Sequence, residues 1–159
     1  MKYRRIGENG NRVKGNKGAA IMFTDGRSLL LLKRSEGSNQ GAWDLPGGGA
    51  RDNETDIGTA IKETKEETGL DSIPGYRFES FVSYDGRKKF TVFLYRVSEQ
   101  FTVDVNEEHS DWEWVSIEDL SNKELHPKLE DNLPRYLKAI RRKIRSFNEW
   151  SQITEMLDF

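Results

Sequence analysis

The feature that most constrains this chain is the stretch WDLPGGGARDNETDIGTAIKETKEETGL, residues 43–70. Three consecutive glycines precede a run of helical periodicity, so the stretch predicts a tight turn followed by a helix. Asn53 is the expected N-cap, with Asp56 as an approximate capping box, and Gly69 is suited to a left-handed C-cap. The expected core-facing stripe consists of apolar or small residues: Ile57, Ala60, Ile61, Thr64 and Thr68.

Three glutamates, Glu63, Glu66 and Glu67, are crowded into five positions of this helix. At about 100° per residue they share an arc of roughly 100° beside the apolar stripe. Like charges at these spacings destabilise a helix, although Lys62 and Glu66 form one favourable pair. A charge run usually marks a solvated face. A divalent cation would instead relieve the repulsion, because Mg²⁺ and Mn²⁺ prefer carboxylate oxygens.

The segments around this helix predict strands and a second helix. Asp-Gly pairs at positions 25–26 and 85–86 predict hairpins that join residues 18–23 to 29–33 and residues 76–84 to 89–97. Residues 101–105 and 112–115 are further candidate strands, and Ser116 is expected to cap a helical turn. From Pro134 onward, apolar residues recur at helical spacing. This order predicts an α/β fold with helices against a mixed sheet.

Length and composition limit the classes of protein to which this chain can belong. A chain of 159 residues suits one domain, and we expect an arm at 1–16, a main domain at 17–147 and a tail at 148–159 packed on the domain or on a partner subunit. The net charge of −2 gives no overall field for nucleic acid, and the absence of cysteine excludes thiolate chemistry. With no long apolar segment, we expect no membrane association. We also expect a cytoplasmic location and either a monomer or a homodimer.

The spaced residues resemble the signature of the Nudix hydrolase family, G-x(5)-E-x(7)-R-E-U-x-E-E-x-G-U, where U is aliphatic. Seven of its nine fixed positions agree, and the lead-in at 45–48 is similar as well. The residues at the nine positions are Gly48, Glu54, Lys62, Glu63, Thr64, Glu66, Glu67, Gly69 and Leu70. The resemblance implies an α/β/α sandwich with a mixed sheet between helices. It also implies Mg²⁺-dependent hydrolysis of a nucleoside diphosphate linked to another moiety, with Mn²⁺ as an alternative ion.

The resemblance also implies roles for single residues. Glu63, Glu66 and Glu67 would ligate metal together with the carbonyl near Gly48, and Glu63 is a candidate proton acceptor. The family often adds an acidic group from the loop before a late strand. Glu108 is our choice for that group, with Glu107 second, and Glu54 would support the cluster.

Two matched positions depart from the family pattern. Lys62 replaces an arginine that orients a catalytic glutamate, and lysine keeps the charge but loses the planar fork. Thr64 replaces an aliphatic residue, and its hydroxyl is expected to bond to the carbonyl of Ala60 one turn earlier.

Substrate contacts are less constrained by the sequence. Arg34 is a candidate phosphate contact, and Trp43 is either a stacking residue or a packing anchor. His109 and His126 are interpreted as surface or turn residues. A basic stretch, residues 135–145, is either a solvated helix face, which we favour, or an RNA contact.

Three functions are consistent with these residues. The first is hydrolysis of a nucleoside triphosphate or of a nucleotide sugar such as ADP-ribose. The second is a nucleotide-binding module with weak turnover, and the third is hydrolysis of RNA 5′ ends.

Overall fold

The computed structural model describes residues 16–157, with side chains through residue 146. The expected arm at 1–16 lies almost wholly outside the described residues. In chain order, the elements are β1 (Lys17–Thr24), β2 (Ser28–Arg34), β3 (Trp43–Asp44), β4 (Gly47–Gly49), α1 (Asp56–Thr68), β5 (Tyr76–Asp85), β6 (Lys88–Arg96), β7 (His109–Ser116), the 3₁₀ helix η2 (Ile117–Asn122) and α2 (Pro127–Leu157).

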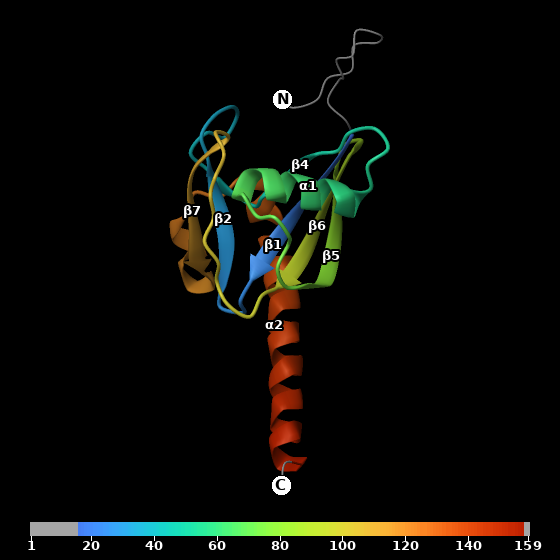
Figure 1. Cartoon of the computed structure of the whole chain (residues 1–159), viewed down its shortest axis with the longest axis vertical. Coiled ribbons are helices and arrows are strands. Elements are labelled where there is room, and N and C mark those ends of the chain that lie inside the picture. Colours follow the sequence, from blue (N-terminus) through green and yellow to red (C-terminus); the bar gives the residue numbers. More distant parts are fainter. Residues whose placement is uncertain (1–15, 158–159) are drawn as a thin grey trace.

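The strands form one mixed sheet in the order β3-β2-β1-β6-β5, with β4 paired to β1 and β7 paired to β2 (Figure 1). Strands β1 and β6 run parallel, whereas the other pairs are antiparallel. Both predicted hairpins are present. The β1–β2 hairpin is paired only at its turn, where Thr24 faces Leu29. At the other end of β1, residues Gly18–Ala20 pair with β4 instead.

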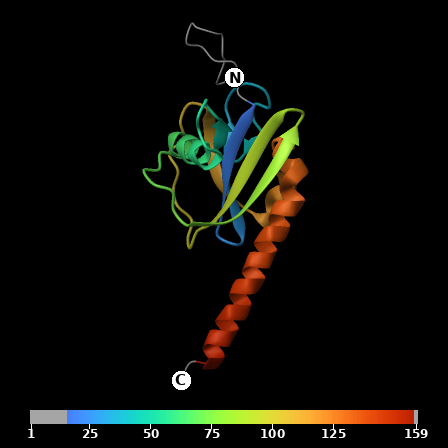
Figure 2. The same cartoon turned by 90° about the vertical axis from the view of Figure 1, so that its right-hand side faces the viewer.

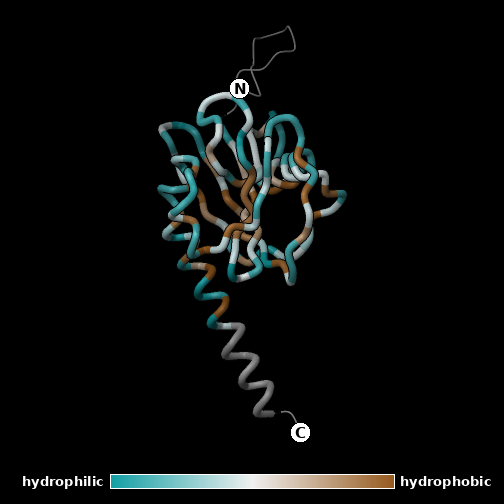
Figure 3. Tube along the Cα trace, turned by 90° about the vertical axis from the view of Figure 1, so that its left-hand side faces the viewer, coloured by the Kyte–Doolittle hydropathy of each residue, from teal (hydrophilic) through white to brown (hydrophobic). Residues whose placement is uncertain are grey.

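The two helices cover opposite faces of the sheet, which confirms the α/β/α sandwich (Figures 1 and 2). Alternate residues of β1 separate the two cores, since successive strand side chains point to opposite faces. Ala20 and Met22 pack on the α2 side, whereas Ala19, Ile21 and Phe23 pack on the α1 side. Figure 3 shows hydrophobic segments inside the sheet region and in the part of α2 beside it.

Helix α1 confirms the predicted C-terminus but not the predicted start. Gly69 has φ 74 and donates its N–H to the carbonyl of Lys65, as a left-handed cap does. The N-cap is Thr55, whose side chain accepts a hydrogen bond from the N–H of Gly58, and the prediction of Asn53 was wrong. Asn53 instead has φ 72 in the turn before the helix. The helix is therefore capped two residues later than expected.

Three other predictions were wrong in detail. Residues 101–105 form no strand, although Phe101 packs edge-on against Trp114 and Phe23. Ser116 is the N-cap residue of η2, as expected, but its side chain makes no cap hydrogen bond. Helix α2 begins at Pro127, so Pro134 lies inside the helix rather than at its start.

Helix α2 continues without interruption from the expected domain into the expected tail, residues 148–157. The packing of that tail stays a prediction, because its side chains lie outside the described set. No helix within residues 16–157 is long and apolar enough to span a membrane.

Candidate functional site

Helix α1 buries two glutamate side chains in the interior of the protein. Glu63 is 1% exposed and Glu67 is 2% exposed, whereas Glu66 lies on the exposed face. The buried face therefore combines Ala60 with threonines and carboxylates, and the expected stripe is rotated: Ile57 and Ile61 are only half-buried. A buried carboxylate is costly unless hydrogen bonds or positive charge compensate it. The burial of two carboxylates one turn apart marks this helix as a functional candidate.

Strand β4 supports one of these carboxylates directly. The N–H of Gly47 donates to Oε1 of Glu67 at 2.9 Å. Gly47 must be glycine, because a Cβ there would lie 2.5 Å from both the Ala19 carbonyl oxygen and the Ala20 Cβ. The three-glycine segment is thus a short strand packed between β1 and α1, rather than a free turn.

Lys62 links two of the matched glutamates. Its Nζ lies 2.5 Å from Oε2 of Glu54 and 3.9 Å from Oε2 of Glu63. Burial raises the pKa of Glu54, but hydrogen bonds from Lys62, from the N–H of Arg51 and from Thr59 outweigh it and lower the pKa to about 2. Glu54 is therefore an anion at neutral pH, and it holds the ammonium group beside Glu63.

Thr64 does not make its expected hydrogen bond. Its buried Oγ1 has no hydrogen-bond partner within the described residues, so the predicted bond to Ala60 was wrong. Thr68 makes the equivalent bond one turn later, since its Oγ1 donates to the carbonyl of Thr64 at 2.6 Å. The aliphatic residue of the family pattern would suit position 64 better.

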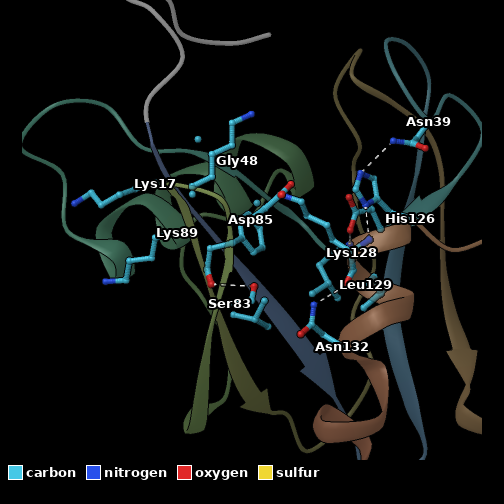
Figure 4. Close-up of a pocket in the computed structure, with 18 of the residues that line it drawn as sticks. Lys17, Asn39, Gly48, Ser83, Asp85, Lys89, His126, Lys128, Leu129 and Asn132 are labelled. Carbon is cyan, nitrogen blue, oxygen red and sulfur yellow. Dashed lines mark hydrogen bonds and ion pairs between the residues drawn. The ribbon is translucent and has the colours of Figure 1, made fainter.

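A cavity of about 400 Å³ opens on the other side of the glycine strand. Figure 4 shows Gly48 at its upper rim, Ser83 and Asp85 of β5 on one wall, and His126, Lys128 and Asn132 on the opposite wall. The lining includes Gly48 and Arg34, two predicted site residues, but none of the glutamates of α1. Gly47–Gly49 thus separates the buried carboxylates from the cavity.

The wall nearest α2 carries a polar network. Arg34 Nη1 lies 3.7 Å from Oδ2 of Asp44, and Asp44 accepts the N–H of Leu45 at 2.8 Å. Burial raises the pKa of Asp44, against the lowering influence of His126, Leu45 and Arg34. His126 Nδ1 accepts the N–H of Lys128 at 3.2 Å.

An aromatic hydroxyl and four ammonium groups extend this lining. Burial raises the pKa of Tyr136 to about 12, so its hydroxyl stays neutral. The cations of the lining besides Arg34 are Lys17, Lys88, Lys89 and Lys128. The cavity thus offers several cations to an anionic ligand.

Sequence reasoning missed most of the cavity. His126 lines it, although it was interpreted as a surface or turn residue. No spacing rule connects His126, Lys128 and Tyr136 with Asp44, because the contact arises only when α2 packs on the sheet. The composition at the true start of α2 gave no signal, because residues 127–133 hold one lysine, two acidic residues and no aromatic residue.

Two predicted residues lie elsewhere. Trp43, predicted as a stacking contact or an anchor, is 7% exposed in the α2-side core, with Lys123 Nζ 4.5 Å from its ring centroid. It does not line the cavity, which favours the anchor. Glu108 lies in the loop before β7, where Asn106 Nδ2 donates to its Oε2 at 3.4 Å and its carbonyl accepts the N–H of Ser35.

The donor chemistry on α1 fits a hard divalent cation. Glu63 and Glu67 are buried carboxyl groups, and Glu66 and the backbone at Gly48 could add oxygen ligands. Among the described side chains of residues 16–146, however, no three Asp, Glu or His groups already converge as a ligand set. Completing the set therefore requires movement of side chains such as the exposed Glu66.

Comparison with known proteins shows a family match over the region that holds this site. The family model described as NUDIX domain matches residues 15–137. The bis(5′-nucleosyl)-tetraphosphatase [asymmetrical] of Mus musculus is 32% identical over 100 residues, covering 57% of this chain and 65% of the mouse protein. The chain thus spans slightly less than two thirds of the curated relatives it matches first.

Solved structures share the fold. A Nudix hydrolase from M. smegmatis, RenU, has a TM-score of 0.65 at 22% identity and covers 96% of this chain and 94% of its own. The bifunctional NMN adenylyltransferase/ADP ribose pyrophosphatase from Francisella tularensis, complexed with AMP and a Mn ion, also gives 0.65, at 19% identity, covering 80% of this chain and 42% of its own.

The family match covers more than half of the chain and includes the buried glutamates of α1, the glycine strand and the cavity. By this match and the shared fold, the chain belongs to the NUDIX domain family.

Proposed function

We propose that this chain is a divalent-metal-dependent hydrolase that cleaves a nucleoside diphosphate linked to another moiety. The observation that carries the proposal is the burial of Glu63 and Glu67 against a glycine strand whose other side lines a cationic cavity. Buried carboxylates beside a cavity of this charge suit a ligand that brings both phosphate and cations. We expect the protein to act in the cytoplasm.

The proposed roles divide between the two sides of β4. Glu63, Glu66 and Glu67 would hold Mg²⁺, or Mn²⁺ as the alternative, with help from the Gly48 carbonyl and from Glu108. When bound, the metal would neutralise phosphate charge and acidify a water molecule. Glu63 is proposed to accept the proton of that water, while Lys62 and Glu54 orient the carboxylate of Glu63.

The cavity suggests how a substrate would be held. Arg34, Lys128 and the exposed ammonium groups of the lining would contact phosphates, and Phe90 and Tyr136 offer aromatic surface. The names of the similar proteins suggest two substrate classes to test first: dinucleoside tetraphosphates and ADP-ribose. Nucleoside triphosphates and triphosphorylated RNA complete the panel.

The test compares the wild type with Glu67→Gln across this panel, with Mg²⁺, with Mn²⁺ and with chelator. Glutamine retains the size of the side chain and can still accept the Gly47 N–H, so we expect normal folding and turnover lowered by about 10²–10³-fold. Glu118→Gln, at an exposed position of η2, is the matched control. Undiminished turnover in Glu67→Gln, or turnover of the wild type in chelator, would refute the site.

A binding module with weak turnover is the second candidate, because Lys62 lacks the arginine fork and is already engaged by Glu54. Metal-dependent nucleotide binding without turnover on any substrate would favour it. Turnover confined to RNA would instead favour action on RNA 5′ ends.

A further inference from the structure

Helix α2 has two halves with different surroundings. Its first half packs on the sheet through Leu129, Tyr136 and Ile140, and Ile144 is half-buried. The rest of the ribbon, to Leu157, continues beyond the end of the sheet in both Figure 1 and Figure 2. Most of a helix's stability in water comes from tertiary packing. Residues 141–157, here called the distal segment, are therefore expected to need a packing partner on the faces that the sheet does not cover.

Charge is strongly polarised along this helix. Residues 135–145 hold six Lys or Arg and no Asp or Glu, whereas residues 146–157 hold Glu149 and Glu155 and no Lys or Arg. Two of the cations already contact β5: Arg135 Nη2 donates to the Val82 carbonyl at 3.0 Å, and Lys143 Nζ lies 5.2 Å from the Tyr76 ring centroid. The others are exposed and follow one face at helical spacing: Lys138, Arg141, Arg142 and Arg145.

The apolar pattern changes face along the same helix. Leu137, Ile140 and Ile144 share the sheet-facing stripe. In the sequence of the distal segment, Trp150, Ile153 and Leu157 follow at i, i+3 and i+7, which places their positions within about 60° of one another. This second stripe is rotated by roughly 140° from the first. It is therefore not a continuation of the surface that packs on the domain.

We propose that the distal segment is a self-association surface, on which a second copy of this chain packs in antiparallel orientation. A two-fold axis near position 147 would pair position 149 of each copy with position 145 of the other, and so place the acidic turns of one copy against the cationic stripe of its partner. A parallel pair would place like charges together, which is destabilising. The charge order along the helix therefore selects both the partner and the orientation.

The size of the distal segment limits the expected affinity of the dimer. Two helical segments of about 25 Å each bury less than the roughly 1,600 Å² of a standard interface. We therefore expect a reversible dimer with a dissociation constant in the micromolar range, rather than an obligate one.

Sedimentation equilibrium across the micromolar range measures this directly with the full chain. We expect wild type to dimerise, and either Arg141→Glu with Arg142→Glu or Glu149→Lys with Glu155→Lys to weaken the dimer by about tenfold or more. An equimolar mixture of these two variants restores opposite charges across the axis and should form a heterodimer. Far-ultraviolet circular dichroism establishes that each variant is folded.

Matched controls place the same charge changes elsewhere on exposed positions: Arg27→Glu with Arg87→Glu, and Glu118→Lys with Asp119→Lys. These should dimerise like wild type. A wild-type chain that stays monomeric throughout, or charge variants that dimerise as it does, would overturn the proposal. A monomeric wild type that binds single-stranded RNA through Arg141 and Arg142 would also overturn it, in favour of a polyanion surface.

Discussion

The two helices that cover the sheet bury opposite kinds of side chain. Helix α1 buries Glu63 and Glu67 with three threonines, whereas the sheet-facing side of α2 buries Leu129, Tyr136, Ala139 and Ile140. Buried charge weakens a fold unless it is compensated, and buried apolar surface strengthens it. The difference teaches that stability and chemistry are separated across the sheet: α2 holds the sandwich together, while α1 carries the candidate metal site at a cost in stability.

The strongest test of this separation is Ile140→Ala on α2. The isoleucine is 1% exposed, so its truncation should lower the free energy of unfolding by about 2–4 kcal/mol. Turnover per folded molecule should change little, because Ile140 neither lines the cavity nor contacts the glutamates of α1. Urea denaturation measures the loss. Ile61→Ala on the half-buried side of α1 is the matched control and should cost less. Equal costs would remove the contrast between the helices.

Lys62→Met sharpens the contrast by removing a compensating charge from α1. A carboxyl whose pKa is lower in the fold than in the unfolded chain stabilises the fold above its unfolded pKa. For Glu54 this contribution is complete above about pH 4.5 and is lost as the pH falls toward 2. Because the carboxylate is 22% exposed, we expect a loss of only about 1–2 kcal/mol at neutral pH.

Unfolding of wild type and Lys62→Met by urea at several pH values measures this difference. The two stabilities should converge as the pH approaches 2. A difference that is independent of pH would mean that Lys62 acts through packing alone.

The smallest expected effect concerns the unpartnered hydroxyl on α1. Thr64→Val removes a buried oxygen without changing the shape of the side chain, and should raise the free energy of unfolding by up to about 1 kcal/mol. Thr68→Val is the matched control, because it deletes a hydrogen bond to the Thr64 carbonyl and should lower stability instead. Both are measured by thermal unfolding. A loss of stability in Thr64→Val would show that its hydroxyl is satisfied in solution.

Local pattern was enough to predict much of this fold. The Asp-Gly turns, the Gly69 cap and the spacing of the glutamates depend on neighbouring residues, and the structure contains both hairpins and α1 near their expected positions. Residues 101–105 have β-prone composition but no strand partner, because pairing is set by the whole sheet. Asn53 and Thr55 are both good caps, and the sequence alone does not choose between them.

The candidate site was predictable only in its helical half. Glu54, Lys62 and Glu63 approach one another because one helix and its preceding turn carry them all. The cavity instead joins β2, β4, β5 and the start of α2, which are distant in the sequence. His126 and Asp44 acquire their shared environment only from that packing, so neither pattern nor composition identified the pair.

The partial pairing of β1 and β2 has a consequence for how new specificities could arise. Strand β2 meets β1 only at their turn. The connection from β2 to β3 is closed by Arg34, which bonds through its backbone to Ala42 and Gly41. Residues 36–40 of that connection are exposed, yet Ser38 and Asn39 reach the cavity. Insertions there would alter the ligand-facing rim without moving a single sheet hydrogen bond. Under the proposed function, this loop is where substrate choice can drift while the buried glutamates remain fixed.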